Sequence, residues 1–173
     1  YNVSIENGLL VFRDSLKNEY PYRNLLEFDS EKREVAHYVR DYWVRGKGLQ
    51  AEALQDNEYK IYQKNIQATV GNVLVFGAEF RLNPAFTLDG CDGFSLSNVN
   101  IWHCGGMGVI AQRSKDIELN SVNVVPSPGK DRMISITADA THFINCKGYI
   151  KMSGCTFMNQ KDDATNIHGW YAV

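Results

Sequence analysis

Two aspartates stand side by side in the stretch NQKDDATNIHG, and a third comes 24 residues before the second of them, in ADATHF. The two stretches share a pattern, because Asp139 to Thr141 aligns with Asp163 to Thr165. Carboxylates held close together repel each other, which favours a protonated acid beside ionised partners. Glycoside hydrolysis needs both forms. A protonated acid gives its proton to the leaving oxygen, and an ionised carboxylate activates the attacking water. Asp139, Asp162 and Asp163 are therefore candidate catalytic residues.

Other interpretations of the same residues stay open. Stacked aspartates can bind calcium through oxygens from neighbouring turns of chain, and aspartate pairs also occur at turns that carry no chemistry. His142 and His168 lie near the aspartates in the sequence, where an imidazole can hydrogen-bond a carboxylate or a sugar hydroxyl, or have a purely structural role. Trp170, close to the second motif, could stack on a sugar ring.

The elements that must position these residues form a repeat. Three segments align without gaps, FSLSNVNI from Phe94, IELNSVNV from Ile117 and IKMSGCTF from Ile150. Each has apolar residues at positions 1, 3, 6 and 8, and Asn, Ser or Gly residues interrupt the alternation between positions 3 and 6. This pattern predicts two short strands joined by a tight bend.

A second set of equivalent positions lies seven residues before each segment, at Thr87, Ile110 and Phe143. Ile167 continues this set. The steps are 23, 33 and 24 residues. A period near 23 with short strands is typical of a parallel β-helix. We therefore predict an all-β chain in which strands at 94–96, 117–119 and 150–152 are parallel neighbours. Asp139 and Asp163 would then lie on adjacent turns, about 4.8 Å apart.

One turn of the repeat is ten residues too long, and the excess falls in residues 126–139, PSPGKDRMISITAD. Its Pro and Gly residues predict a loop, and its end at Asp139 predicts that 126–138 forms a rim of the substrate site. Residues 1–85 are less regular and are interpreted as N-terminal β-helix coils with an insertion. Residues 86–173 are the coils that carry the aspartates, and the two parts are predicted to form one continuous domain.

Composition excludes several classes of protein. The chain is 44% hydrophobic and 22% charged, which is typical of a globular protein. Its net charge is −2 and its basic residues are scattered, which argues against a nucleic-acid partner. No apolar run approaches the roughly 18 residues of a membrane span. The four cysteines lack metal-binding spacing and are interpreted as buried free thiols or, less favoured, as including one disulfide.

The stretches SPGKDRMISITADATHFINCKG and FMNQKDDATNIHG resemble glycoside hydrolase family 110, and PYRNLLEF and EVAHYVRDYW are similar to that family's upstream region. The resemblance implies a right-handed parallel β-helix. It also implies an exo-acting α-1,3-galactosidase that acts on terminal α-galactosyl glycans such as the blood group B antigen. Such enzymes invert the anomeric centre and use no metal or cofactor. Family members are several times longer, so we expect a fragment of a larger enzyme, with a further domain or chain covering its last coil.

The resemblance also assigns roles. It makes Asp162 the general acid, and it gives Asp139 and Asp163 the task of holding the water. Inversion would require roughly 6.5–9.5 Å between acid and base. The polar and aromatic residues expected to bind the substrate are His142, Asn166, His168, Arg132 and Trp170. The family's work in bacterial glycan degradation implies a secreted or periplasmic protein.

Two rival functions remain from the sequence. One is a β-helix that binds carbohydrate without turning it over. The other is a pectin-type hydrolase or a calcium-dependent lyase on the same scaffold, which would need cations for the carboxylates of uronic acids. Lys130 and Arg132, in the long loop, are available for that task.

Overall fold

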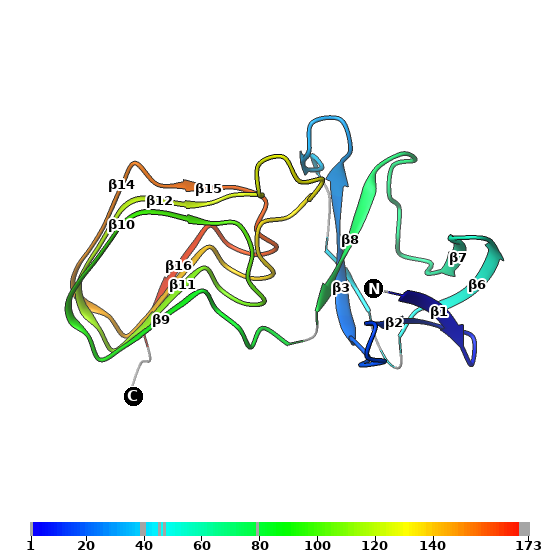
Figure 1. Cartoon of the computed structure of the whole chain (residues 1–173), viewed down its shortest axis with the longest axis horizontal. Coiled ribbons are helices and arrows are strands. Elements are labelled where there is room, and N and C mark those ends of the chain that lie inside the picture. The colour runs from blue at the N-terminus through cyan, green and yellow to red at the C-terminus, as the bar shows by residue number, and fades with distance from the viewer. Residues whose placement is uncertain (1, 39–40, 45, 47, 79, 170–173) are drawn as a thin grey trace. The chain divides into compact units, whose positions relative to one another are not determined.

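The computed structural model describes residues 2–38, 41–44, 46, 48–78 and 80–169. Every element in these ranges is a β-strand (Figure 1), so the predicted all-β class is confirmed. The described residues include no helix of the length and apolar character that a membrane crossing requires. The chain divides into two compact units, Tyr1–Glu79 and Phe80–Val173. The single continuous domain expected from the sequence stays a prediction.

The first unit contains two antiparallel sheets. The strands of one are, in spatial order, β1 (Asn2–Glu6), β2 (Leu9–Arg13), β6 (Gln50–Gln55) and β7 (Glu58–Tyr62). The other is built around β3 (Tyr22–Asp29), which pairs with β4 (Glu34–Val35), β5 (Tyr42–Trp43) and β8 (Val73–Ala78). Leu25 and Phe28 of β3 are fully buried.

This antiparallel pairing corrects the interpretation of residues 1–85 as β-helix coils. The cause is local turn chemistry. Asn7 and Gly8, which join β1 to β2, both have positive φ angles of 50° and 75°, the backbone that a two-residue hairpin requires. Asn57, between β6 and β7, has a φ of 60°. A two-residue turn reverses the chain at once, so the strands that it joins can only be antiparallel.

The second unit contains two parallel sheets. One has the order β16 (Thr165–His168), β13 (Thr141–Ile144), β11 (Val109–Gln112) and β9 (Phe86–Asp89). The other has the order β10 (Asp92–Ile101), β12 (Lys115–Val124) and β14 (Lys147–Ser153), with β15 (Thr156–Phe157) also paired to β12. Phe94 lies opposite Ile117 and Ile117 opposite Ile150, which confirms the predicted parallel neighbours. Successive turns of chain therefore lie one on another, as Figure 1 shows.

The predicted bend inside each repeat is also present. Asn98, Ser121 and Gly154 occupy the fifth position of the three aligned segments, and their φ angles are 56°, 52° and 62°. Asn and Gly tolerate this left-handed conformation better than other residues. The polar residues that interrupt the apolar alternation therefore turn the chain at the same point in each layer.

One predicted register is wrong by a single residue. Ile110 lies opposite Thr87 as expected, but its other neighbour is His142, and Phe143 lies opposite Ala111. The step between β11 and β13 is thus 32 residues, whereas Ile117 and Ile150 are 33 apart. The additional residue enters where the β12–β14 register shifts, between Lys115 and Ile117. The sequence repeat had assigned the whole excess to the long loop.

The long excursion before Asp139 is only partly a loop. Ser135, Ile136 and Ala138 are buried. Ile136 forms a parallel bridge with Cys104 and accepts a hydrogen bond from the Lys161 backbone N–H at 3.2 Å. Ser135 and Ile136 therefore contact the turns of chain on either side of them. The exposed residues of the segment lie among 126–134, and the rim predicted for 126–138 stays a prediction.

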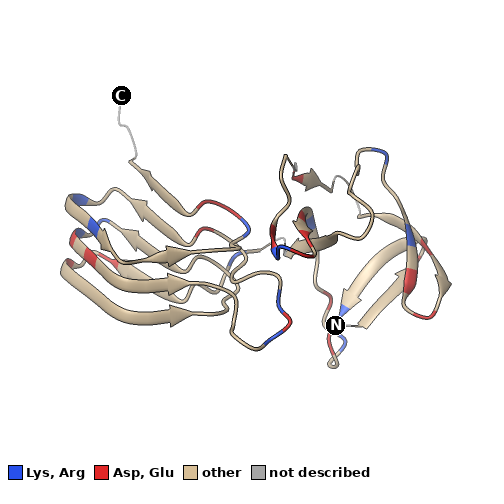
Figure 2. Ribbon diagram, turned by 90° about the horizontal axis from the view of Figure 1, so that it is seen from above, with Lys and Arg blue, Asp and Glu red and all other residues tan. Residues whose placement is uncertain are grey.

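The core of the second unit consists of apolar residues that repeat from layer to layer. Its fully buried members include Val109, Ile117, Leu119, Val122, Val124 and Phe143. The four cysteines are free thiols that pack against this core, as the favoured interpretation predicted, but each is only partly buried rather than buried. Figure 2 shows that the charged residues of this unit gather at the bends and ends of its strands. The stacked strands therefore bury an apolar core, and their alternate side chains are polar and face away from it.

Candidate active site

The structure brings the three predicted aspartates together. Asp139 lies two residues before β13, and Asp162 and Asp163 come just before β16. Thr141 pairs with Thr165, so Asp139 and Asp163 occupy the same position on neighbouring layers. The Ala140 N–H donates to the Asp163 carbonyl at 2.9 Å, which fixes this register at the site itself. One carboxylate oxygen from each aspartate lies within 4.8 Å of the others.

The three carboxylates differ in exposure. The side chain of Asp139 is 4% exposed, whereas that of Asp162 is 39% exposed. Asp163 is also exposed. A solvent-borne ligand can therefore reach Asp162 and Asp163 directly, with Asp139 at the back of the cluster. A buried carboxylate requires partners that compensate its lost hydration.

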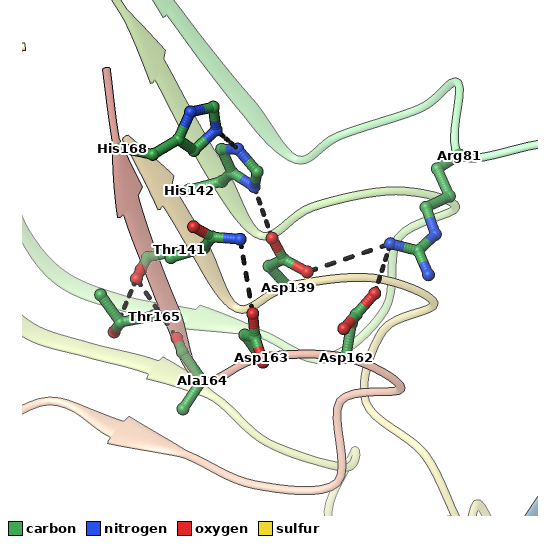
Figure 3. A network of polar contacts seen from close by, with 10 residues as sticks. Arg81, Asp139, Thr141, His142, Asp162, Asp163, Ala164, Thr165 and His168 are labelled. Carbon is green, nitrogen blue, oxygen red and sulfur yellow. Dashed lines mark hydrogen bonds and ion pairs between the residues drawn. The ribbon is translucent and has the colours of Figure 1, made fainter. Parts of the chain in front are cut away.

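Arg81 is the principal site residue that sequence reasoning missed. Its Nη1 lies 2.6 Å from Oδ2 of Asp162 and 4.0 Å from Oδ1 of Asp139. Figure 3 shows the guanidinium reaching both carboxylates from the opposite side to the histidines. Arg81 precedes the first repeat, so no periodicity marks it. Its positive charge offsets part of the repulsion within the aspartate cluster.

Gly106 makes room for the segment that carries Arg81. A Cβ atom on Gly106 would lie 2.9 Å from the Pro84 nitrogen and 3.0 Å from the Arg81 carbonyl oxygen. Any larger residue would thus push residues 81–84 away from the stack. Gly108 has a similar role between layers, because its Cβ would lie 2.5 Å from the Ala140 oxygen.

The two histidines predicted to bind substrate contact protein groups of the cluster, and their role towards a substrate stays a prediction. Nδ1 of His142 is hydrogen-bonded to Oδ2 of Asp139. Its Nε2 lies 2.9 Å from Nε2 of His168, and the rings are nearly perpendicular at 84°. Only one proton can lie between these two Nε2 atoms, so the protonation of one ring constrains that of the other. The histidine pair therefore extends the hydrogen-bonded network outwards from buried Asp139.

The remaining predicted binding residues are placed differently. Asn166 donates from Nδ2 to Oδ2 of Asp163 at 3.4 Å, so it belongs to the cluster. Arg132 contacts His103 instead, with Nη2 2.7 Å from Nδ1. Trp170 lies outside the described residues.

The donor set favours acid–base chemistry. Three carboxylate oxygens are also ligands that calcium accepts, but calcium takes six to eight oxygens. Here a guanidinium already contacts two of the three carboxylates. Carboxylates in unlike surroundings, with an arginine and an imidazole as partners, can divide the acid and base tasks of a hydrolysis.

Comparison with known proteins gives a consistent family. The chain is 38% identical to α-1,3-galactosidase A of Shewanella woodyi, over 99% of its own length and 28% of the relative. It is 34% identical to α-1,3-galactosidase B of Bacteroides thetaiotaomicron, over 57% of this chain and 16% of that protein. Against α-1,3-galactosidase B of Phocaeicola vulgatus the identity is 28%, over 84% of this chain and 24% of the relative.

No protein-family model matches the chain. The relatives agree with one another in name, and the first of them matches across nearly all of this sequence. The chain spans 28% of the length of the first relative, 16% of the second and 24% of the third. On this likeness the chain belongs to the family of the α-1,3-galactosidases.

Proposed function

We propose that this chain carries the catalytic aspartates of a glycoside hydrolase that removes terminal α-1,3-linked galactose from glycans. The observation that carries the proposal is the convergence of Asp139, Asp162 and Asp163 within 4.8 Å, in a chain whose relatives are named α-1,3-galactosidases. The exposure of two of the three carboxylates supports it, because a sugar can reach them.

In the proposed reaction, protonated Asp162 gives its proton to the glycosidic oxygen as the bond between that oxygen and the anomeric carbon breaks. A water held by Asp139 and Asp163 attacks the anomeric carbon from the opposite face. One proton of this water passes to Asp163, which is exposed, whereas Asp139 is buried against His142. At the end of the reaction Asp162 has lost a proton and Asp163 has gained one. Proton exchange with solvent restores both groups.

Inversion is proposed from the resemblance to glycoside hydrolase family 110. Inverting enzymes separate their carboxyl groups by roughly 6.5–9.5 Å, and retaining enzymes by about 5–5.5 Å. The nearest oxygens here lie within 4.8 Å, so the resting spacing does not match the expected inverting value. The anomer of the released sugar distinguishes the two outcomes. Independence from metals is supported by Arg81, which supplies positive charge to the cluster.

We further infer that residues 86–168 are part of a right-handed parallel β-helix. The support is the layer-to-layer register of both parallel sheets and the strong preference of parallel crossovers for the right hand. Secretion or a periplasmic location is proposed from the family's role in glycan degradation. The substrates proposed are terminal α-galactosyl glycans, including the blood group B type.

The deciding experiment mixes the protein with a terminal α-1,3-galactoside and follows free galactose by proton NMR. The chain is measured alone and within the full product of its gene. Release of β-galactose as the first product supports an inverting galactosidase, and release of α-galactose supports retention. Activity that persists in EDTA supports the metal-free mechanism. Binding without release by the complete product would favour the carbohydrate-binding alternative.

A further inference from the structure

Two features of the aspartate cluster disagree with the roles proposed for its members. Asp162 has to carry a proton as the general acid, but its Oδ2 lies 2.6 Å from Nη1 of Arg81. An arginine in contact with a carboxyl group favours the ionised form, which has no proton to give. The carboxylates also approach within 4.8 Å, closer than an inverting reaction uses.

Both disagreements involve Arg81. The same Nη1 that pairs with Asp162 lies 4.0 Å from Asp139, so one guanidinium nitrogen faces the acid and its buried neighbour at once. A cation in this position attracts both carboxylates and keeps them closer than their mutual repulsion favours. The pairing of Asp162 with a cation and the short spacing of the carboxylates both involve this one guanidinium.

Arg81 is placed where a ligand can compete for it. Its side chain is 21% exposed, and that of Asp162 is 39% exposed. The segment before β9 that carries Arg81 is packed on Gly106, outside the stacked parallel strands. Among the described residues, the printed contacts place Arg81, Asp139 and Asp163 at Asp162, with His142 and then His168 beyond Asp139, and Lys161 precedes Asp162 in the chain.

We propose that Arg81 is a positioning residue that clamps Asp162 in the resting site and releases it when a galactoside binds. The inference rests on the proposed function. In the resting protein Arg81 holds the Asp162 carboxyl group by an ion pair and keeps it near Asp139. Sugar hydroxyls that enter beside the cluster accept the guanidinium hydrogen bonds in place of the Asp162 carboxylate. Asp162 then takes a proton from solvent and is free to move towards the leaving oxygen.

The test compares two pH profiles of Arg81→Gln, because kcat/KM reports groups of the free enzyme and kcat reports those of the substrate complex. In the wild-type protein the clamp acts only before the substrate binds. As the pH is raised, kcat/KM should therefore decline at a lower pH than kcat does; this decline is the high-pH limb of each profile. In Arg81→Gln the kcat/KM limb moves to higher pH, because the ion pair with the carboxyl group is lost. The kcat limb stays where it is, since the clamp is already open in the complex.

Arg113→Gln is the matched control. Arg113 lies in the same unit, and its Nη2 contacts the two oxygens of Asp89 at 2.6 and 2.5 Å on an exposed surface. It should leave both profiles unchanged. Arg81→Lys keeps the charge but not the planar fork, so a smaller shift in the same direction is expected. If circular dichroism shows that Arg81→Gln does not fold, Arg81→Lys is used in its place.

The outcomes separate the clamp from its release. Equal movement of both limbs in Arg81→Gln would show that the arginine stays on Asp162 in the complex and would overturn the release. A kcat/KM limb that does not move would overturn the clamp itself. If the wild-type gene product releases no galactose, the proposed function fails, and carbon-13 titration of the aspartate carboxyl groups tests the resting clamp independently. One carboxyl of Arg81→Gln should then take up its proton at higher pH than in the wild type, and identical titrations would overturn the clamp.

Discussion

Asp139 and Asp163 occupy equivalent positions on adjacent layers, yet their surroundings differ. Asp139 is buried, with His142 at one oxygen and Arg81 4.0 Å from the other. Asp163 is exposed and receives a hydrogen bond from Asn166 at 3.4 Å. A buried carboxylate with fixed partners suits orientation of a water, and an exposed one can exchange its proton with solvent. The repeat therefore duplicates a position, and neighbouring side chains make the two copies different.

At the residue scale, Asp162→Asn should remove the general acid. We expect kcat/KM to fall by about 10²–10⁴ on galactosides with poor leaving groups, because protonation of the leaving oxygen is lost. Activated aryl galactosides should be affected much less, since their leaving groups need little protonation. The comparison is made by steady-state kinetics on the gene product that releases galactose.

Asp139→Asn and Asp163→Asn are the controls for this contrast. Both should damage the two substrate types alike, because each substrate requires an activated water. Equal losses on both substrates for all three variants would remove the assignment of Asp162 as the acid, while the three-aspartate site would stand.

At the scale of elements, the site depends on how closely neighbouring layers approach. Gly106 contacts the backbone of the segment that carries Arg81, and Gly108 contacts the carbonyl that follows Asp139. Side chains at these positions would separate the layers that hold the cluster. The glycine stretch between β10 and β11 therefore positions the site residues without contributing a functional group.

Gly106→Ala tests this positioning. Its added Cβ would lie 2.9–3.0 Å from the backbone of residues 81–84, so the Arg81 segment has to shift. If Arg81 acts on Asp162, the pH profile of kcat/KM should change in the same direction as in Arg81→Gln. Displacements of about 1 Å in an active site can lower rates by up to about 10²-fold. Gly105→Ala is the control, because its Cβ would make an ordinary contact at 3.5 Å with the Asn83 side chain. A normal profile in Gly106→Ala would show that this packing does not govern Arg81.

At the scale of the whole molecule, the two units pair their strands by opposite rules. In residues 2–78 every pair between named strands is antiparallel, and in residues 86–168 every such pair is parallel. Antiparallel strands bring opposing Cα atoms to about 4.5 Å in alternate pairs, whereas parallel ladders have evenly spaced, slanted hydrogen bonds. The two units should therefore have distinct signatures in solution.

Nuclear Overhauser spectra provide the measurement. We expect strong contacts between opposing Hα atoms in the β1–β2 and β6–β7 pairs, because only antiparallel strands bring these atoms face to face. The β10–β12 pair should show none, although it is longer. The β1–β2 pair is the internal reference for assignment quality. Hα–Hα contacts between β10 and β12 would contradict the parallel stack.

The sequence alone determined the parts of the protein that repeat. A layer that stacks on its neighbour needs apolar residues at the same positions in each turn, so the pairing of Phe94, Ile117 and Ile150 could be predicted from spacing. The same logic placed Asp139 and Asp163 on adjacent layers, and the bend residues were visible as breaks in the alternation. These predictions succeeded because each depends on an offset along one chain.

Only the tertiary structure decided the features without a period. Arg81 reaches the aspartates from outside the repeat, and the register beyond Ile110 depends on where one additional residue enters the β12–β14 pair. Asn7-Gly8 is a hairpin signal that pairs β1 with β2 antiparallel, where the sequence analysis predicted β-helix coils. Spacing specifies which residues are equivalent within a stack. It does not specify which side chains approach from other segments, because that is set by packing and by charge in three dimensions.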